Sequence, residues 1–339
     1  MTRVAITALL LTTWATLPFP ARAQRRLDDS QARLVLRFLG AVEKNEDAKP
    51  LIDSIMAAPG TGLVIAQQNL SRRVSAAEYR EVLVAFAEHL DLLAARLDTI
   101  GGLDVDAAAR RMALENLPER VPLEVSEYLV MGGRAGAAAT AGGIYFDVLV
   151  TSHRSGDHFP APRQVVEFFA HELHHVGMEA ILDGRERQLR LDDEARRALG
   201  LVRGLVMEGS ASYLINGHRD LAAMRIDPGL AASGDDRERM VRVERILSGV
   251  LESHWTDVQY ERAMTDFTGN SLHMTGAAML DAIWHAGGRK AVMAVLLDPR
   301  LLLGRYDETV ARTTSSYRFP EDLAHRLAEL GGSAGRERR

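Results

Sequence analysis

The 339-residue sequence contains no cysteine. The chain therefore forms no disulfide bond, and its stability has to come from a hydrophobic core. A metal ion bound to this chain has no thiolate ligand, which leaves histidine and carboxylate side chains as the candidate ligands.

Lysine is nearly absent, because only Lys44, Lys49 and Lys290 of the 41 basic residues are lysines. We interpret the excess of arginine as a bias of genome composition and not as an arginine-rich binding surface. The formal net charge is −5, and it falls to −7 when the two arginines of the first 23 residues are left out. An acidic chain does not favour a nucleic-acid partner, whose phosphates attract a basic surface.

Long apolar runs are also missing: beyond residue 23 no stretch reaches the roughly 18 apolar residues that cross a bilayer. We therefore expect no stable membrane insertion. Residues 1–23 have the pattern of a secretory signal peptide, with Arg3 before a short apolar run and small residues at Ala21 and Ala23. We expect an exported, periplasmic or secreted protein that begins at Gln24.

The periodicity of apolar residues predicts a predominantly helical α+β fold with a small sheet. We find no internal repeat and no linker that forces a division, so residues 24–339 are predicted to form a single unit. Within it we expect a helical scaffold (24–116), a central core (117–300) and a helical end (301–339). The predicted strands are 123–131 and 143–151, and the predicted helices are 28–58, 76–100, 163–183, 201–216, 237–255, 274–285, 290–297 and 321–330.

The motif HExxH stands in the middle of the helix predicted for 163–183, as His171, Glu172 and His175. Residues four apart lie on one helix face, with Cβ atoms about 5–6 Å apart. Both imidazoles can therefore reach one ion at about 2.0–2.1 Å. Glu172 lies to the side of that face, where its carboxylate can take a proton from an attacking water.

The five-residue pattern also occurs by chance on ordinary core helices. Here its neighbours indicate a buried helix, in which two histidines and a glutamate are costly without partners. A metal ion supplies such a partner. The apolar neighbours are Val165, Val166, Phe168, Phe169, Leu173 and Val176.

A catalytic zinc ion usually has three protein ligands, so a third has to be found. Glu179 stands eight residues from His171, about 12 Å along the helix axis, which is too far to share one ion. Glu208 is the best candidate, because it is a carboxylate in an apolar helix and Gly209 lets that helix approach closely. The alternative is an exposed or salt-bridged glutamate.

An HExxH helix followed by a Glu-Gly helix resembles the gluzincin-type zinc metallopeptidases. Three segments, His171–His175, Glu208–Ser212 and Leu272–Gly276, more narrowly resemble an uncharacterised bacterial family of zinc-dependent peptidases. The resemblance covers roughly residues 117–297. It implies a peptide or protein substrate, Zn²⁺ held by His171, His175 and Glu208, and Glu172 as the general base.

The resemblance also implies a strand beside the metal helix that pairs with an extended peptide, and Gly143–Val150 fits this role. Such proteins often have a tyrosine three residues before the glycine matched by Gly276, where this chain has His273. Either side chain can donate a hydrogen bond to a developing oxyanion, so His273 is the second catalytic candidate. The alternative is a histidine at a helix entry or on the surface.

His174 is expected to pack away from the ion, and Tyr213, His153 and His158 are weaker candidates for substrate contacts. A di-iron carboxylate protein would need a second ExxH pair, which the sequence lacks. The remaining alternative to a zinc peptidase is a non-catalytic helical binding protein with a fortuitous or vestigial HExxH. The pattern does not distinguish endopeptidases from exopeptidases, and it does not predict an oligomeric state.

Overall fold

The computed structural model describes residues 27–68, 75–132, 136–140, 142–148, 161–217, 236–252, 255–267, 270–311 and 317–331. The expected signal peptide, His153 and His158 lie outside the described residues. The chain divides into two compact units. One contains the described residues up to Met112 together with Leu123–Leu173, and the other contains Ala113–Pro122 and the chain from His174 onward. That residues 24–339 act as a single unit stays a prediction.

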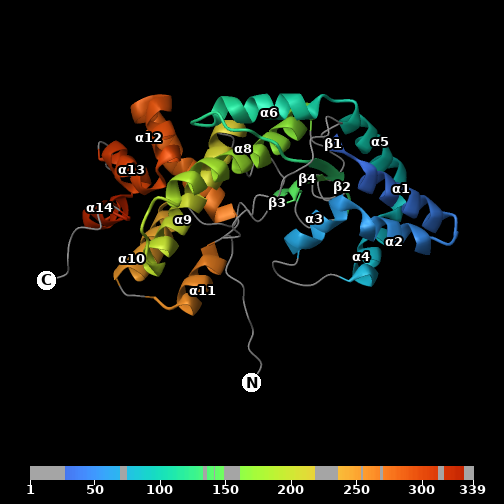
Figure 1. Ribbon diagram of the computed structural model, residues 1–339, viewed down its shortest axis with the longest axis horizontal. Helices are drawn as coiled ribbons and strands as arrows, with labels where there is room; N and C mark the ends of the chain where they lie inside the picture. The colour runs from blue at the N-terminus through green and yellow to red at the C-terminus, as the bar shows by residue number, and fades with distance from the viewer. Residues whose placement is uncertain are drawn as a thin grey trace, which may run out of the picture. The chain divides into compact units, whose positions relative to one another are not determined.

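The first part of the chain forms short helices where two longer ones were predicted. The expected helix 28–58 is interrupted at Asn45, whose φ of 57° is left-handed and incompatible with a continuing helix. The expected helix 76–100 changes to a 3₁₀ turn after its first nine residues. The helices are α1 (Ser30–Glu43), α2 (Lys49–Ala57), α3 (Pro59–Gln68), α4 (Ala76–Val84), α5 (Leu90–Gly101) and α6 (Val105–Asn116), with a 3₁₀ turn at Ala87–His89 (Figure 1).

The sheet of the first unit has four strands in the order β1-β2-β4-β3. β1 pairs parallel to β2 and β2 parallel to β4, whereas β3 is antiparallel to β4. Both predicted strands are confirmed in shortened form, and β1 and β3 were not predicted. The strands are β1 (Leu27–Asp28), β2 (Glu127–Val130), β3 (Ala137–Thr140) and β4 (Gly143–Asp147).

The HExxH helix is α8 (Pro162–Glu186), which begins one residue before the predicted start and ends three after the predicted end. Its first half packs on the sheet, because the ring of Phe146 in β4 lies 5.7 Å from the rings of both Phe168 and Phe169. The boundary between the two units falls within α8, after Leu173. The predicted fold, a mainly helical α+β protein with a small sheet beside this helix, is confirmed.

The second unit is helical in its described residues. The segments predicted as 274–285 and 290–297 are both helical and lie in α12, on either side of a non-helical kink at Gly288, whose φ is 65°. None of the described helices is long and apolar enough to cross a membrane. The helices are α9 (Asp193–Ser210), α10 (Asp236–Glu252), α11 (Asp257–Phe267), α12 (Asn270–Leu297), α13 (Leu302–Val310) and α14 (Glu321–Ala328), with a π-helical turn at Ala211–Ile215 and a 3₁₀ turn at Pro299–Leu301.

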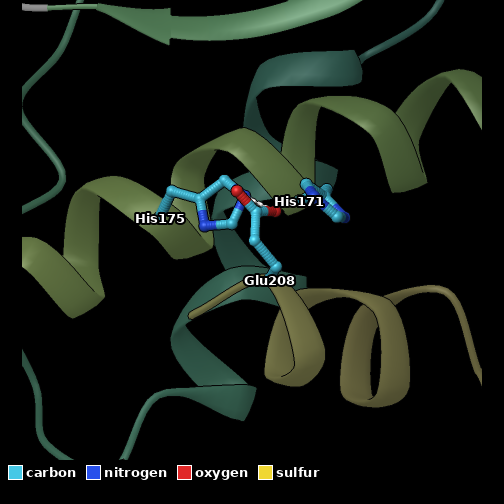
Figure 2. A group of neighbouring side chains, drawn as sticks. All are labelled: His171, His175 and Glu208. Atoms are coloured by element: carbon cyan, nitrogen blue, oxygen red, sulfur yellow. Dashed lines mark ion pairs between the residues drawn. The ribbon is translucent and has the colours of Figure 1, made fainter. Parts of the chain in front are cut away.

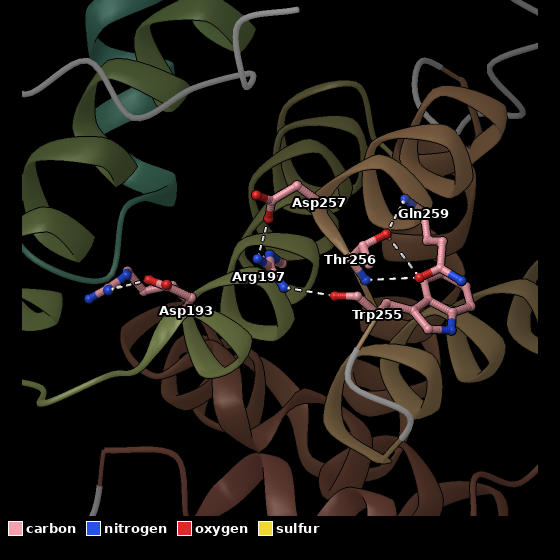
Figure 3. Close-up of polar contacts among 7 residues, drawn as sticks. Asp193, Arg197, Trp255, Thr256, Asp257 and Gln259 are labelled. Atoms are coloured by element: carbon pink, nitrogen blue, oxygen red, sulfur yellow. Dashed lines mark hydrogen bonds and ion pairs between the residues drawn. The ribbon is translucent and has the colours of Figure 1, made fainter.

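Polar contacts attach the first half of α9 to the start of α11 (Figure 3). Arg197 donates a hydrogen bond of 3.0 Å to the carbonyl oxygen of Trp255 and forms an ion pair with Asp257. In return, the Tyr260 hydroxyl donates a hydrogen bond of 3.1 Å to the carbonyl oxygen of Arg197. These contacts tie α11 to the helix that carries Glu208.

The second half of α9 crosses α12 at two glycines, where the backbones touch. A Cβ atom on Gly209 would lie 2.3 Å from the carbonyl carbon of Gly276. One on Gly276 would lie 2.0 Å from the carbonyl oxygen of Leu205. Both distances are far below van der Waals contact, so the two helices can cross this closely only because glycine has no side chain.

We expect Gly276→Ala to lower the free energy of unfolding by about 1–3 kcal/mol, because the added methyl group forces the two backbones apart. The matched control is Gly184→Ala in α8, where a Cβ would meet nothing within 4 Å. That substitution should raise the free energy of unfolding by about 0.4–1 kcal/mol, because alanine restricts the unfolded chain. Urea unfolding of both variants measures the difference. Equal stability of the two variants would contradict the tight crossing.

Candidate metal centre

The two histidines of the motif lie one turn apart on α8 with their rings on the same side (Figure 2). The helix is anchored by Val165, Phe169 and Leu173, which are buried, while His171 and His175 are half-buried at its accessible side. The sequence therefore positions both imidazoles through the ordinary spacing of an α-helix. Each histidine thereby offers one ring nitrogen to an ion that a residue of another segment can also reach.

That other segment is α9, which carries Glu208. One ligand atom from each of His171, His175 and Glu208 lies within 4.8 Å of the other two. The Nε2 atom of His175 is 3.1 Å from the Oε2 atom of Glu208. The structure thus brings together the three residues that were predicted to bind the metal.

This arrangement fits a zinc ion. Two ligands at about 2.0–2.1 Å from a tetrahedral zinc are about 3.3 Å apart, close to the separation of the His175 and Glu208 atoms. Two imidazole nitrogens and one carboxylate oxygen are also the ligand set of many catalytic zinc sites, in which a fourth position stays open. The donor atoms of this chain therefore match a catalytic zinc site in type, and the His175–Glu208 pair also matches it in spacing.

His174, which was expected to pack away from the ion, is completely buried. Its Nε2 atom lies 2.8 Å from the hydroxyl oxygen of Ser210, two residues after Glu208. That hydroxyl donates its own proton to the carbonyl oxygen of Met207 at 3.2 Å, so His174 is the donor in the first contact. This hydrogen bond ties α8 to α9 directly beside Glu208.

His273 lies in the first turn of α12 and also contacts Glu208. Its Nδ1 atom is 3.2 Å from Oε2 of Glu208 and 3.1 Å from the hydroxyl oxygen of Ser212. His273 does not belong to the group of three whose ligand atoms lie within 4.8 Å of one another. Its predicted role as an oxyanion donor stays a prediction.

Ser210 and Ser212 were not predicted as site residues. The spacing provides a signal for Ser212, which stands four residues after Glu208 and so lies on the same helix face. Tyr213, a weaker candidate for substrate contact, is 2% exposed and lies edge-on to Trp284 at 6.0 Å. It is therefore a core residue, and that expectation was wrong.

Glu172 lies outside the ligand group and is half-buried. Its charge acts on Tyr145 of β4: burial raises the pKa of that phenol, and the negative charges of Asp147 and Glu172 raise it further. The carboxylate of Glu172 therefore lies within electrostatic range of the sheet that α8 packs against. Its predicted role as general base stays a prediction.

The expectation that the strand in Gly143–Val150 offers an edge to an extended peptide is wrong for β4. β4 pairs with β2 on one side and with β3 on the other, so its backbone groups are already used by neighbouring strands. A strand has two hydrogen-bonding edges, and an extended peptide can only add to one that is unpaired. Among the described strands, the free edges belong to β1 and β3.

The fold and the three clustered side chains define a helical α+β protein with a candidate two-histidine, one-glutamate metal site. A family model described as "Putative zinc dependent peptidase (DUF5700)" matches residues 37–315, more than four-fifths of the chain. The chain belongs to this family. No curated protein and no solved structure gives a significant match.

Proposed function

We propose that this protein is an exported zinc-dependent peptidase that hydrolyses peptide bonds. The observation that carries the proposal is the cluster of His171, His175 and Glu208, whose ligand atoms lie within 4.8 Å of one another in a member of this family. Export is supported by the signal-like pattern of residues 1–23.

His171 and His175 would hold the zinc ion from α8, and Glu208 would hold it from α9. When bound, zinc polarises the carbonyl group of the substrate and lowers the pKa of water. The carboxylate of Glu172 takes a proton from the attacking water while the water oxygen bonds to the peptide carbon. The protonated Glu172 then gives that proton to the leaving amine as the carbon–nitrogen bond breaks.

The test measures the zinc content of the purified protein and its cleavage of a diverse peptide library. We expect about one zinc per chain and cleavage that a chelator abolishes and added zinc restores. Bound zinc without cleavage of any peptide would favour the non-catalytic binding protein. Absence of zinc binding would overturn the site itself.

Glu208→Ala is expected to weaken zinc binding by orders of magnitude, because it removes one of three ligands. Excess zinc should partly restore hydrolysis, since the two histidines and Glu172 remain in place. Asp193→Ala is the matched control, because Asp193 lies on the same helix with its side chain 78% exposed. Titration with a chromophoric chelator gives the affinities. Tight zinc binding and full activity in Glu208→Ala would place the third ligand elsewhere.

A further inference from the structure

The crossing of α9 and α12 determines which side chain of α12 meets Glu208. Glu208 directly precedes Gly209, one of the two glycines in contact. His273 stands one turn before Gly276, the other glycine, and so lies on the face of α12 that meets α9. The backbone contact therefore places the imidazole of His273 next to the carboxylate of Glu208.

The contact joins the Nδ1 atom of His273 to the Oε2 atom of Glu208, which are 3.2 Å apart. A carboxylate oxygen offers no proton, so the contact is attractive when Nδ1 carries one. The separation is that of an ion pair between a protonated imidazole and a carboxylate.

The ring of His273 is itself held by Ser212. The Ser212 hydroxyl oxygen is 3.1 Å from the same Nδ1 atom, and Ser212 is nearly completely buried. Ser212 and Glu208 both contact the Nδ1 atom of His273, so they face α12 together. Ser212 therefore limits how far the imidazole can turn away from the carboxylate.

We propose that His273 is a positioning residue, whose Nδ1–H group holds the Glu208 carboxylate in the orientation that faces His175. This inference rests on the proposed zinc site. Groups that hydrogen-bond to metal ligands orient them, and removing such a group typically weakens metal binding about 10–100-fold. The Oε2 atom of Glu208 is in contact with both His175 and His273, so the two imidazoles hold the carboxylate from two sides of the crossing.

Three substitutions of His273 separate positioning from oxyanion donation. The side-chain amide nitrogen of asparagine can stand near the place of Nδ1, whereas that of glutamine reaches the place of Nε2. We expect His273→Ala and His273→Gln to weaken zinc binding about 10–100-fold. His273→Asn should bind zinc within a few-fold of the unmodified protein. Competition with a chromophoric chelator, without substrate, measures all four affinities.

An oxyanion donor would give the opposite pattern. Zinc affinity would be unchanged in all three variants, kcat would fall, and His273→Gln would be more active than His273→Asn; this result would overturn the inference. Circular dichroism shows whether His273→Ala folds. If it does not fold, the zinc affinities of His273→Asn and His273→Gln decide between positioning and oxyanion donation. If the unmodified protein bound no zinc, the proposed function would be refuted. If the unmodified protein and all His273 variants bound zinc equally well, only this inference would be refuted.

Discussion

Glu172→Gln is expected to retain zinc and to lose nearly all hydrolysis of peptides. The amide keeps the shape of the side chain but cannot take a proton from the attacking water. Removal of a general base typically costs about 10²–10⁴-fold in rate. Zinc binding should persist, because Glu172 lies outside the group of three candidate ligands. The measurement combines zinc stoichiometry with kcat on one cleaved peptide.

The matched control for this prediction is Glu179→Gln, which alters another half-buried glutamate of the same helix. Glu179 stands about 12 Å along the helix from His171, too far to share its metal ion. The control should therefore retain both zinc and hydrolysis. If Glu172→Gln lost its zinc, or if it hydrolysed peptides as fast as the control, the assignment of the base would be wrong.

His171→Ala and His175→Ala are each expected to lose the bound zinc. With one of three ligands gone, the affinity should fall by orders of magnitude, and hydrolysis should disappear with the metal. Metal analysis after dialysis against a weak chelator measures the occupancy. His285→Ala is the control, because this histidine of α12 has a side chain that is 73% exposed and lies outside the ligand group.

Thermal unfolding provides an independent readout of the same site. A ligand at 100 times its Kd stabilises the folded state by about 2.7 kcal/mol, so added zinc should raise the Tm of the unmodified protein. Neither histidine variant should show this increase at the same zinc concentration. Full zinc occupancy in both variants would show that these two histidines do not hold the metal.

The sequence by itself was sufficient for features that arise within one helix. His171 and His175 lie on one face of α8 because residues four apart always do, and the apolar neighbours predicted that the helix would be buried. Glu208 could be identified because an acidic side chain in an apolar helix needs a partner. The helical content and the positions of β2 and β4 followed from periodicity and from β-branched and aromatic residues in the same way.

The tertiary structure decided which segments meet. The alanine-rich strand β3 has no strand signature of its own, yet by pairing with β4 it removes the open edge expected there. The contact of His273 with Glu208 depends on the crossing of two helices at Gly209 and Gly276. The sequence predicted that Gly209 allows a close approach, but not that Gly276 would be its partner. Local periodicity reports how a segment faces a core, whereas the identity of its neighbour is set by packing between distant segments. The candidate ligands were therefore predictable, but the residues that hold them in place were not.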